Sequence, residues 1–471
     1  MRHVVFLAAT VLGFFTAACG HGTSSSPTTQ TTAASASSRS GTGAGAGARA
    51  KDAPLPFIED DYPRALAEAK AKNKPLFVDG WATWCHSCLS LKSYVLTAPE
   101  MRAQADNFVW LSLDSEKDQN APFFQKFGLS VLPTLWVIDP QTEQIAWKLP
   151  GALTAKELTA ALDGVRNKGG NAGEAESLFA EGVRADAHKD PGGAARLYEK
   201  ALAASPRTWN HRAEAVAAYV TDLSTTKQAE RCAQVADHEA PSLPMGTYRV
   251  NAAVIGTGCA QDQPQGSPGH THLAPLVKEL TDIVHTKAGI LADDRSGAFD
   301  ELISALKSDG KKDVARQMAA EWAAFLEGEA QRAPDPKARA VFDAHRMLAY
   351  AELGDPARSI PMFSQTERDF PDDYNPPARL SRTYFELKRY DEALDAASRA
   401  ITKSYGPRKL RLYQLKADIA AAKKDAPAER KALDEALQFA STVSLREGYE
   451  KLRAQLAERR AKLGTGATAQ R

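Results

Sequence analysis

Two cysteines separated by two residues, in the stretch Trp84-Cys85-His86-Ser87-Cys88, constrain this chain more than any other feature. They follow the apolar run 75–82, which is typical of a buried strand, and the pattern after it predicts a helix that begins near Cys85. At a helix start, free backbone N–H groups and the helix dipole favour a thiolate over a thiol. Cys88 lies one turn further on, where it can attack a mixed disulfide formed on Cys85. The stretch therefore predicts a redox-active dithiol.

A C-x-x-C can also be half of a structural zinc site. The chain contains no second C-x-x-C and no H-x-x-x-H that would complete a tetrahedron. His270 and His272 follow the loop 266–269, and we expect them in solvent rather than as ligands. We therefore predict neither a metal nor an organic cofactor, because the dithiol itself carries two electrons. Delivery of Cu(I) through the two thiols is a further alternative.

Length, charge and cysteine count narrow the class of protein. A chain of 471 residues predicts two to four domains. Its formal net charge of +1 gives no indication of a nucleic-acid partner or of an electrostatically held membrane surface. If Cys19 is modified and the C-x-x-C is redox-active, Cys232 and Cys259 remain to bridge each other. That arrangement suits an oxidising compartment.

The N-terminus has the pattern of an export signal. Arg2 and His3 precede the apolar run 4–15, and small residues lead to Cys19. The cysteine after Thr-Ala-Ala resembles a bacterial lipoprotein signal over residues 1–19. The resemblance implies that Cys19 becomes the mature N-terminus and carries a lipid, which tethers the chain to the inner or outer membrane. An ordinary signal peptide with an incidental cysteine is the alternative, and both place the protein outside the cytoplasm. Residues 20–53 are rich in Ser, Thr, Ala and Gly and predict a disordered linker.

Between residues 54 and 166, helical and strand patterns alternate and a hairpin pattern follows. This order predicts an α/β domain with a mixed sheet covered on both faces. The expected helices are 60–73, 85–95, a short one from Pro99, 122–127 and 154–162, and the expected strands are 76–82, 108–114, 135–139 and 144–147.

Several motifs of this domain occur in a familiar order. They are Asp79 with Trp81-Ala82, the Trp-Cys-x-x-Cys stretch, 131–134 (Val-Leu-Pro-Thr) and 150–153 (Pro-Gly-Ala-Leu). Together they resemble the thioredoxin fold, and the pattern is similar to the periplasmic C-terminal domain of the membrane disulfide interchange reductase. The resemblance implies a thiol–disulfide oxidoreductase that acts on protein disulfides.

The resemblance also implies a role for each site residue. Cys85 would be the exposed nucleophile and Cys88 the buried resolving thiol, while Asp79 would lie beneath Cys88 and relay its proton. A carboxylate in an apolar strand is costly to bury without such a task, although an edge aspartate that reaches solvent is the alternative. Pro133 would be a cis proline that faces the cysteines. With Leu132 and Trp84 it would contact substrate, whereas Trp81 would only pack around the site.

The dipeptide between the cysteines departs from thioredoxin itself. It is His86-Ser87 instead of Gly-Pro, and Leu89 replaces the basic residue often found next. A protonated imidazole beside Cys85 would stabilise the thiolate and make the couple more oxidising, whereas a neutral one would have little effect. The direction of electron flow is therefore open, between reductase and oxidase or isomerase.

Beyond Gly169-Gly170, the composition becomes rich in Ala, Leu, Glu, Arg and Lys with helical periodicity. Small residues at Gly182, Ala194 and Ala201 permit close helix contact, Tyr198 fills the gap between the helices, and Pro206 ends the second helix. These positions resemble the tetratricopeptide repeat.

The same spacing recurs later, and Ser359 to Ala393 gives the step of about 34 residues of that family. We expect an all-α repeat region over 174–464, degenerate between about 207 and 340, with a capping helix over 445–463 and a disordered tail over 465–471. A generic helical bundle is the alternative for the degenerate part.

Such repeats present a concave groove, which predicts a protein partner. Two alternatives remain. The whole protein could act mainly as a non-catalytic adaptor and not as an enzyme. The repeat region could only support the catalytic domain and bind no partner.

Overall fold

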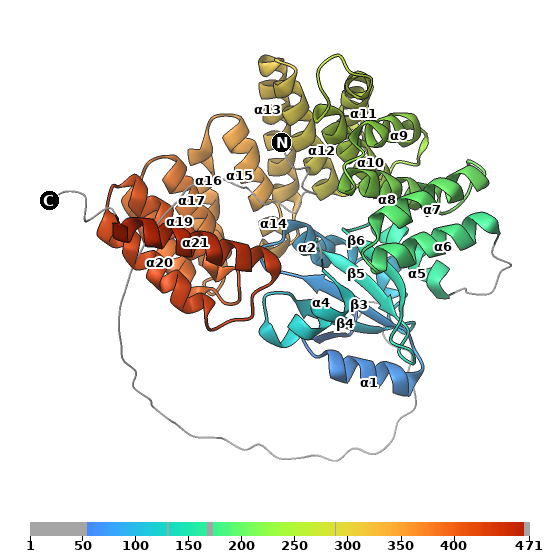
Figure 1. Ribbon diagram of the computed structural model, residues 1–471, viewed down its shortest axis with the longest axis horizontal. Coiled ribbons are helices and arrows are strands. Elements are labelled where there is room, and N and C mark those ends of the chain that lie inside the picture. Colours follow the sequence, from blue (N-terminus) through green and yellow to red (C-terminus); the bar gives the residue numbers. More distant parts are fainter. Residues whose placement is uncertain (1–53, 130, 167–172, 288, 466–471) are drawn as a thin grey trace.

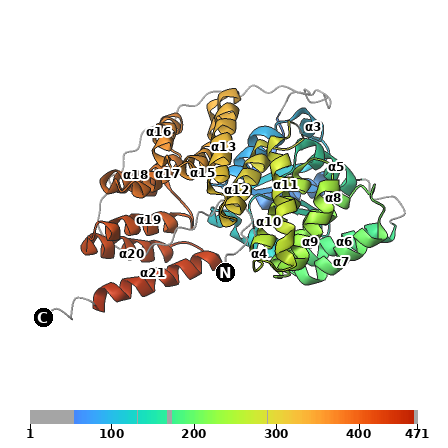
Figure 2. The ribbon, with the colours of Figure 1, turned by 90° about the horizontal axis from the view of Figure 1, so that it is seen from above.

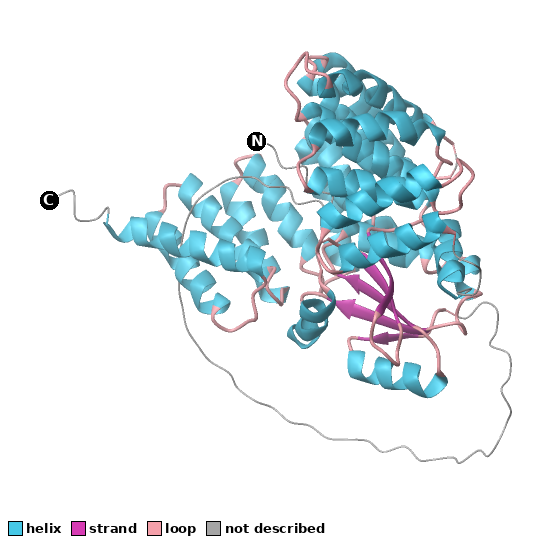
Figure 3. Ribbon diagram, turned by 45° about the vertical axis from the view of Figure 1, so that its right-hand side comes forward, coloured by secondary structure: helices cyan, strands magenta, loops and turns pink. Residues whose placement is uncertain are grey.

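The structure is a computed structural model that describes residues 54–129, 131–166, 173–287 and 289–465. The predicted signal with Cys19, the linker and residues 466–471 of the predicted tail lie outside the described residues. The described chain consists of a small α/β domain followed by a long all-helical region, which confirms the predicted fold class (Figure 3).

The α/β domain contains a five-stranded mixed sheet in the order β2-β4-β3-β5-β6. Strands β2 and β3 run parallel to β4, whereas β5 is antiparallel to both β3 and β6. The sequence analysis missed β2, because three residues are too few to show a strand period. The bounds are β2 (Phe57–Glu59), β3 (Leu76–Trp81), β4 (Val109–Asp114), β5 (Thr134–Ile138) and β6 (Ile145–Pro150).

Helices cover both faces of the sheet, because alternate residues of each strand point to opposite sides. Leu76 and Val78 pack on α1 and α4, whereas Phe77 packs with α5 and the cysteine helix. Gly80 is required on β3, since a Cβ there would lie 2.6 Å from the Trp136 ring. The bounds are α1 (Tyr62–Lys72), α2 (His86–Ser90) with a π-helical turn (Leu91–Val95), α3 (Pro99–Arg102), α4 (Ala121–Phe127) and α5 (Ala155–Arg166).

The helical region is built mainly from antiparallel helix pairs that contact their neighbours in the chain. A Cβ on Gly182 would lie 2.6 Å from the Tyr198 ring, so the close helix contact expected from the small residue is present. The bounds are α6 (Glu174–Ala187), α7 (Pro191–Ala204), α8 (Arg212–Thr225), α9 (Ala229–Glu239), α10 (Thr247–Gln261), α11 (Leu273–His285), α12 (Ala292–Ser308), α13 (Lys312–Arg332), α14 (Pro336–Ala340), α15 (Asp343–Glu352), α16 (Ser359–Asp369), α17 (Asn375–Glu386), α18 (Tyr390–Lys403), α19 (Lys409–Ala422), α20 (Ala426–Ala440) and α21 (Glu447–Thr465).

These helices form an arch around the α/β domain. Figure 1 shows α6–α8 on one side of the sheet and α19–α21 on the other, with α12 and α14 between them. Figure 2 shows α19, α20 and α21 stacked side by side at the far end of the arch. The α/β domain is therefore contacted by helices from the beginning, the middle and the end of the helical region.

Candidate redox site

The two cysteines of the C-x-x-C form a disulfide at the start of α2. Cys85 is the N-cap residue of that helix, and the Cys88 N–H donates to the Cys85 Sγ atom at 3.1 Å. The predicted helix start is confirmed. A negative charge on Cys85 Sγ would be stabilised by this N–H and by the helix N-terminus, which is the arrangement that favours a thiolate.

The exposure predicted for Cys85 is wrong in this structure. The residue is 4% exposed, and Cys88 is fully buried. The physical reason lies outside the α/β domain, because the helical region lies over the start of α2. A disulfide-exchange partner can meet Cys85 only through the space that this cover leaves, or after the cover moves.

Polar contacts hold the cover on the residues just before Cys85. Arg379 Nη2 donates to the Trp84 carbonyl at 3.3 Å, and Asn375 Nδ2 donates to the Thr83 carbonyl at 3.2 Å. The Arg408 guanidinium lies 4.4 Å from the centre of a Trp84 ring, within the range of a cation–π interaction. Trp84 thus contacts the protein's own helical region, and its contact with substrate stays a prediction.

Glu116 provides a second contact between the two parts. Its carboxylate accepts from the Arg408 backbone N–H at 2.6 Å and from Arg446 Nη2 at 3.1 Å. Burial raises the pKa of Glu116, while Arg446 and Arg408 oppose that rise. Nothing in the local sequence distinguishes this glutamate from a surface one, since both partners lie about 300 residues further along the chain.

Asp79 lies on β3 and is fully buried, which excludes the alternative of an edge aspartate in solvent. Its carboxylate forms an ion pair with Lys92 at 3.1 Å, and neither oxygen accepts a hydrogen bond of good geometry. Burial raises the pKa of Asp79, and the Lys92 ammonium acts in the opposite direction. The sequence analysis missed Lys92, which also lies 4.2 Å from the centre of the Trp81 ring. The available signal was that Lys92 is the only Lys, Arg, Asp or Glu between residues 85 and 99. The proton relay through Asp79 stays a prediction.

The Leu132–Pro133 peptide bond is cis, as the resemblance implies. Leu132 packs with Cys85 and Cys88 in one small apolar cluster, so the loop before β5 lies against the disulfide. Leu129 packs against the same cluster from the other end of this loop. The structure thus brings the cysteines and the proline loop together, and their roles in substrate binding stay predictions.

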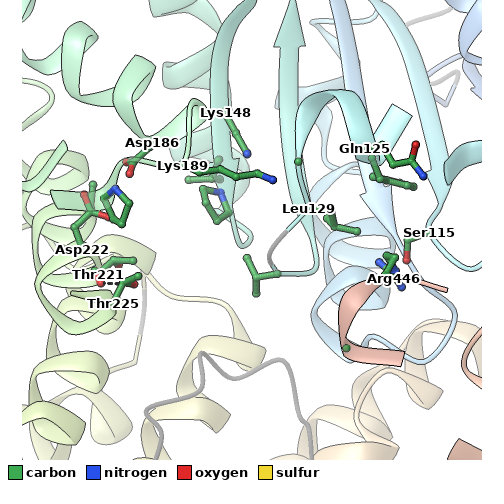
Figure 4. Close-up of a pocket in the computed structure, with 18 of the residues that line it drawn as sticks. Ser115, Gln125, Leu129, Lys148, Asp186, Lys189, Thr221, Asp222, Thr225 and Arg446 are labelled. Atoms are coloured by element: carbon green, nitrogen blue, oxygen red, sulfur yellow. Dashed lines mark hydrogen bonds between the residues drawn. The ribbon is translucent and has the colours of Figure 1, made fainter. Parts of the chain in front are cut away.

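A cavity of about 1090 Å³ opens beside this loop, between the α/β domain and both ends of the helical region. Figure 4 shows Asp186, Lys189 and Asp222 on one side of it and Gln125, Ser115 and Arg446 on the other, with Leu129 between them. Leu129 lines the cavity and also packs against the disulfide cluster, so only this side chain links the two, and neither cysteine lines the cavity.

The helical wall of the cavity carries two neighbouring acids, of which Asp222 is buried and Asp186 is half-buried. Burial and the nearby Asp186 carboxyl raise the pKa of Asp222 to about 9. Burial also raises the pKa of Asp186, which accepts a hydrogen bond from the Tyr198 hydroxyl at 2.8 Å. This end of the cavity therefore holds the Asp222 carboxyl in its protonated form at neutral pH, next to the Asp186 carboxyl.

His86, between the two cysteines, is also buried and points away from the cavity-lining loop into the helical region. Its Nδ1 atom lies 2.8 Å from Asp293 Oδ1 and its Nε2 atom lies 3.1 Å from His345 Nε2. The sequence analysis missed both partners, which are 207 and 259 residues away along the chain.

The second disulfide joins Cys232 on α9 to Cys259, as the count of cysteines suggested. Cys259 lies inside α10, near its C-terminal end. Both residues belong to the largest apolar core of the helical region. His272, expected in solvent, is partly buried and its Nδ1 atom lies 2.8 Å from Asp237 Oδ2.

Among the helices in the described part of the chain, none is long and apolar enough to cross a membrane.

Comparison with known proteins places the resemblance in the α/β domain. Residues 58–140 match the thioredoxin-like family. The thiol:disulfide interchange protein DsbD of Cronobacter sakazakii is 34% identical over 88 residues, which cover 18% of this chain and 15% of that protein. DsbD of Pseudoalteromonas atlantica is 30% identical over 89 residues, with the same coverage of 18% and 15%. The chain thus matches only a small part of these relatives.

Among solved structures, the "Assembly Chaperone of RpL4 (Acl4)" covers 63% of this chain and 99% of its own, at 10% identity and a TM-score of 0.27. A score this low does not indicate a shared fold for the helical region.

Proposed function

We propose that this protein is a thiol–disulfide oxidoreductase that acts on protein disulfides through Cys85 and Cys88, and that its helical region controls access to them. The observation that carries the proposal is the Cys85–Cys88 disulfide at a helix N-terminus, beside a cis proline loop, in a domain similar to part of DsbD. The two thiols can exist as a disulfide or as a dithiol, and interconversion of these two states is the chemistry of the class.

In the reductive direction, the Cys85 thiolate attacks one sulfur of a substrate disulfide and releases the other substrate sulfur as a thiolate. Cys88 then attacks the Cys85 sulfur, which forms the Cys85–Cys88 disulfide and frees the second substrate thiol. The substrate gains two electrons and two protons, and the protein loses them. Asp79 would accept the proton that leaves Cys88. A dithiol reductant must then restore the protein, and the reverse sequence of steps makes it an oxidant.

The cavity beside Leu129 is the route we propose for substrate. It adjoins the loop that carries Pro133, and its walls come from the α/β domain and from both ends of the helical region. A peptide segment in the cavity would contact Leu129 and would have to displace it to reach the disulfide cluster, whereas neither Arg379 nor Arg408 lines the cavity. A folded substrate is too large for the cavity and would require the cover to open.

The setting of this activity is also part of the proposal. The export signal and Cys19 support a protein outside the cytoplasm, held to a membrane by a lipid. The spacing of Gly182, Tyr198 and later small residues supports tetratricopeptide-like repeats that recruit a protein partner.

The direct test is reduction of insulin disulfides by the full chain with dithiothreitol as electron source. We expect the wild type to accelerate the reaction and Cys85→Ser to abolish the acceleration. In the source cells, Cys88→Ser should retain substrates as mixed disulfides on Cys85, because the resolving thiol is missing. A wild type no faster than Cys85→Ser would contradict the enzymatic proposal.

The burial of Cys85 favours a second candidate function, a non-catalytic adaptor whose helical region binds partners. In that case the disulfide at Cys85 would only fasten the start of α2. The insulin assay separates the two candidates, since an adaptor requires neither thiol.

A further inference from the structure

Three side chains from three separate elements meet over the start of the cysteine helix. They are His86 on α2, Asp293 on α12 and His345 on α15. Their side chains are only 5%, 13% and 5% exposed, respectively. His86 belongs to the α/β domain and the other two to the helical region, so the cluster lies across the boundary between the two parts.

The two imidazole rings pack against each other, with ring centroids 3.9 Å apart, an interplanar angle of 54° and Nε2 atoms 3.1 Å apart. If both imidazoles are neutral, one Nε2 must donate a proton to the other. One ring then has its Nδ1 lone pair on the side of the Asp293 carboxylate, which lies 2.8 Å from His86 Nδ1 and 3.8 Å from His345 Nδ1. The cluster is satisfied only when it holds one positive charge, either an extra proton on a histidine or a bound cation.

A metal ion would satisfy all of it. Zinc lies about 2.0–2.1 Å from histidine nitrogen, so two nitrogens on one tetrahedral ion are about 3.3 Å apart, close to the separation observed here. A turn of the closely packed rings would bring both Nε2 lone pairs onto the ion, and each Nδ1 would then carry a proton on the side of the Asp293 carboxylate. A carboxylate that orients metal-bound histidines through their second nitrogen is a common arrangement around protein metal ions.

We propose that His86 and His345, oriented by Asp293, bind a divalent transition-metal ion that fastens the helical region to the cysteine helix. Two imidazoles favour Zn²⁺, Cu²⁺, Ni²⁺ or Co²⁺ over Mg²⁺ and Ca²⁺, which prefer oxygen ligands. The remaining coordination positions are open to water or to an added ligand. Within the described residues, this is the one group of three metal-ligating side chains whose donor atoms lie within 4.8 Å of one another. The inference does not depend on the proposed activity.

The sequence predicts no metal site, since the C-x-x-C has no second pair of ligands nearby. The structure supplies donors that are distant in the chain. The metal-binding atoms of this site are therefore not the sulfurs of Cys85 and Cys88, because a disulfide sulfur is not a thiolate ligand.

The test is metal binding by the oxidised full chain, freed of metal with a chelator and with both disulfides intact. Co²⁺ is added and followed by its visible absorption, and Zn²⁺ is measured by competition with a chromophoric chelator. We expect saturable binding at this cluster, with affinity at least tenfold lower in His345→Gln. The difference in affinity between the wild type and His345→Gln reports on this cluster alone, because metal bound elsewhere on the chain is the same in both.

His272→Gln is the matched control, because His272 also lies 2.8 Å from an aspartate but belongs to no group of three ligands. It should bind like the wild type. Asp293→Asn should weaken binding while preserving the size of the side chain, and circular dichroism of each metal-free variant checks that it folds. Absence of saturable binding, or equal binding by the wild type and His345→Gln, would overturn the proposal.

A second measurement tests the fastening itself. Zn²⁺ should slow reduction of the Cys85–Cys88 disulfide by a phosphine reductant in the wild type and leave the rate in His345→Gln unchanged. Equal rates with and without Zn²⁺ in the wild type would show that the ion does not fasten the cover.

Discussion

The two disulfides of this protein are both buried, but their surroundings differ. Cys85–Cys88 closes a loop with a sequence separation of 3 and lies at the boundary between the α/β domain and the helical region. Cys232–Cys259 has a sequence separation of 27 and joins two packed helices inside the largest apolar core.

The difference teaches that low exposure by itself does not distinguish a reactive disulfide from a structural one. The cover over Cys85 is held partly by hydrogen bonds and ion pairs, each of which contributes on the order of 1 kcal/mol net. Access to Cys232 requires α9 and α10 to separate, with the loss of apolar packing from many side chains. What decides reactivity is which part of the molecule must move.

The largest expected effect is on the rates of reduction of the two disulfides. In native buffer, a phosphine reductant should reduce Cys85–Cys88 at least about 1000-fold faster than Cys232–Cys259, because the free energies of the two openings differ by several kcal/mol. Timed alkylation followed by mass spectrometry of the cysteine peptides measures both rates in one sample. Similar rates would remove the distinction drawn between the two sites.

The second prediction concerns stability. Replacement of Cys232 and Cys259 by alanine should lower the free energy of unfolding by about 3 to 4 kcal/mol, since the unfolded chain regains the freedom of the loop. Urea unfolding followed by circular dichroism measures the loss. The double variant Cys85→Ala with Cys88→Ala is the comparison, and its much shorter loop should give a loss of about 2 kcal/mol or less. If the Cys85/Cys88 variant lost more stability than the Cys232/Cys259 variant, Cys85–Cys88 and not Cys232–Cys259 would be the structural disulfide.

The third prediction tests the cover over Trp84. The double variant Arg379→Ala with Arg408→Ala removes a hydrogen bond and a cation–π contact, and should speed reduction of Cys85–Cys88 about tenfold, which corresponds to about 1.4 kcal/mol. Arg389→Ala is the control, because Arg389, the residue before α18, makes a similar contact with Tyr384 on α17, 4.7 Å from the ring centre. Cys232–Cys259 should be unaffected by either change. An unchanged rate for Cys85–Cys88 would show that other contacts hold the cover.

The smallest effect is a pH dependence of stability that arises in the helical wall of the cavity. Asp222 lies there on α8, which packs next to the helix that carries Cys232. Burial raises the pKa of Asp222 to about 9, so the folded chain keeps a proton that the unfolded chain loses above about pH 4. Stability from this group is therefore full below about pH 4 and is lost as the pH rises towards 9.

The stability gap between Asp222→Asn and the wild type should accordingly widen in favour of the variant as the pH rises from 4 to 8, because only the wild type must keep this carboxyl protonated. Urea unfolding at several pH values measures the gap, and the exposed Asp372→Asn should show no such trend. In the wild type, reduction of Cys232–Cys259 should become slightly faster as the pH rises, because the helices around it lose the stability that protonated Asp222 contributes. This increase comes in addition to the effect of pH on the reactivity of the reductant itself. A gap that is independent of pH would contradict the assignment.

Local rules of the sequence determined much of the α/β domain. The strand and helix periods gave the mixed sheet, the start of α2 followed from the residues around Cys85, and the burial of Asp79 followed from its apolar strand. The spacing of Gly182 and Tyr198 predicted a close helix contact that the structure contains. Each of these depends on residues within about 20 positions of one another, for which periodicity and capping are informative.

Only the tertiary structure decided what surrounds the dithiol. The burial of Cys85, the contacts of Trp84 with Arg379 and Arg408, the cluster at His86 and the cavity beside Leu129 all join residues from the two parts of the molecule. Their physical origin is the curvature of an arch of helices, which accumulates from small angles at each helix pair. The sequence of any one helix pair does not determine the total curvature of the arch. The sequence therefore indicated the chemistry of the dithiol but not the cover that controls access to it.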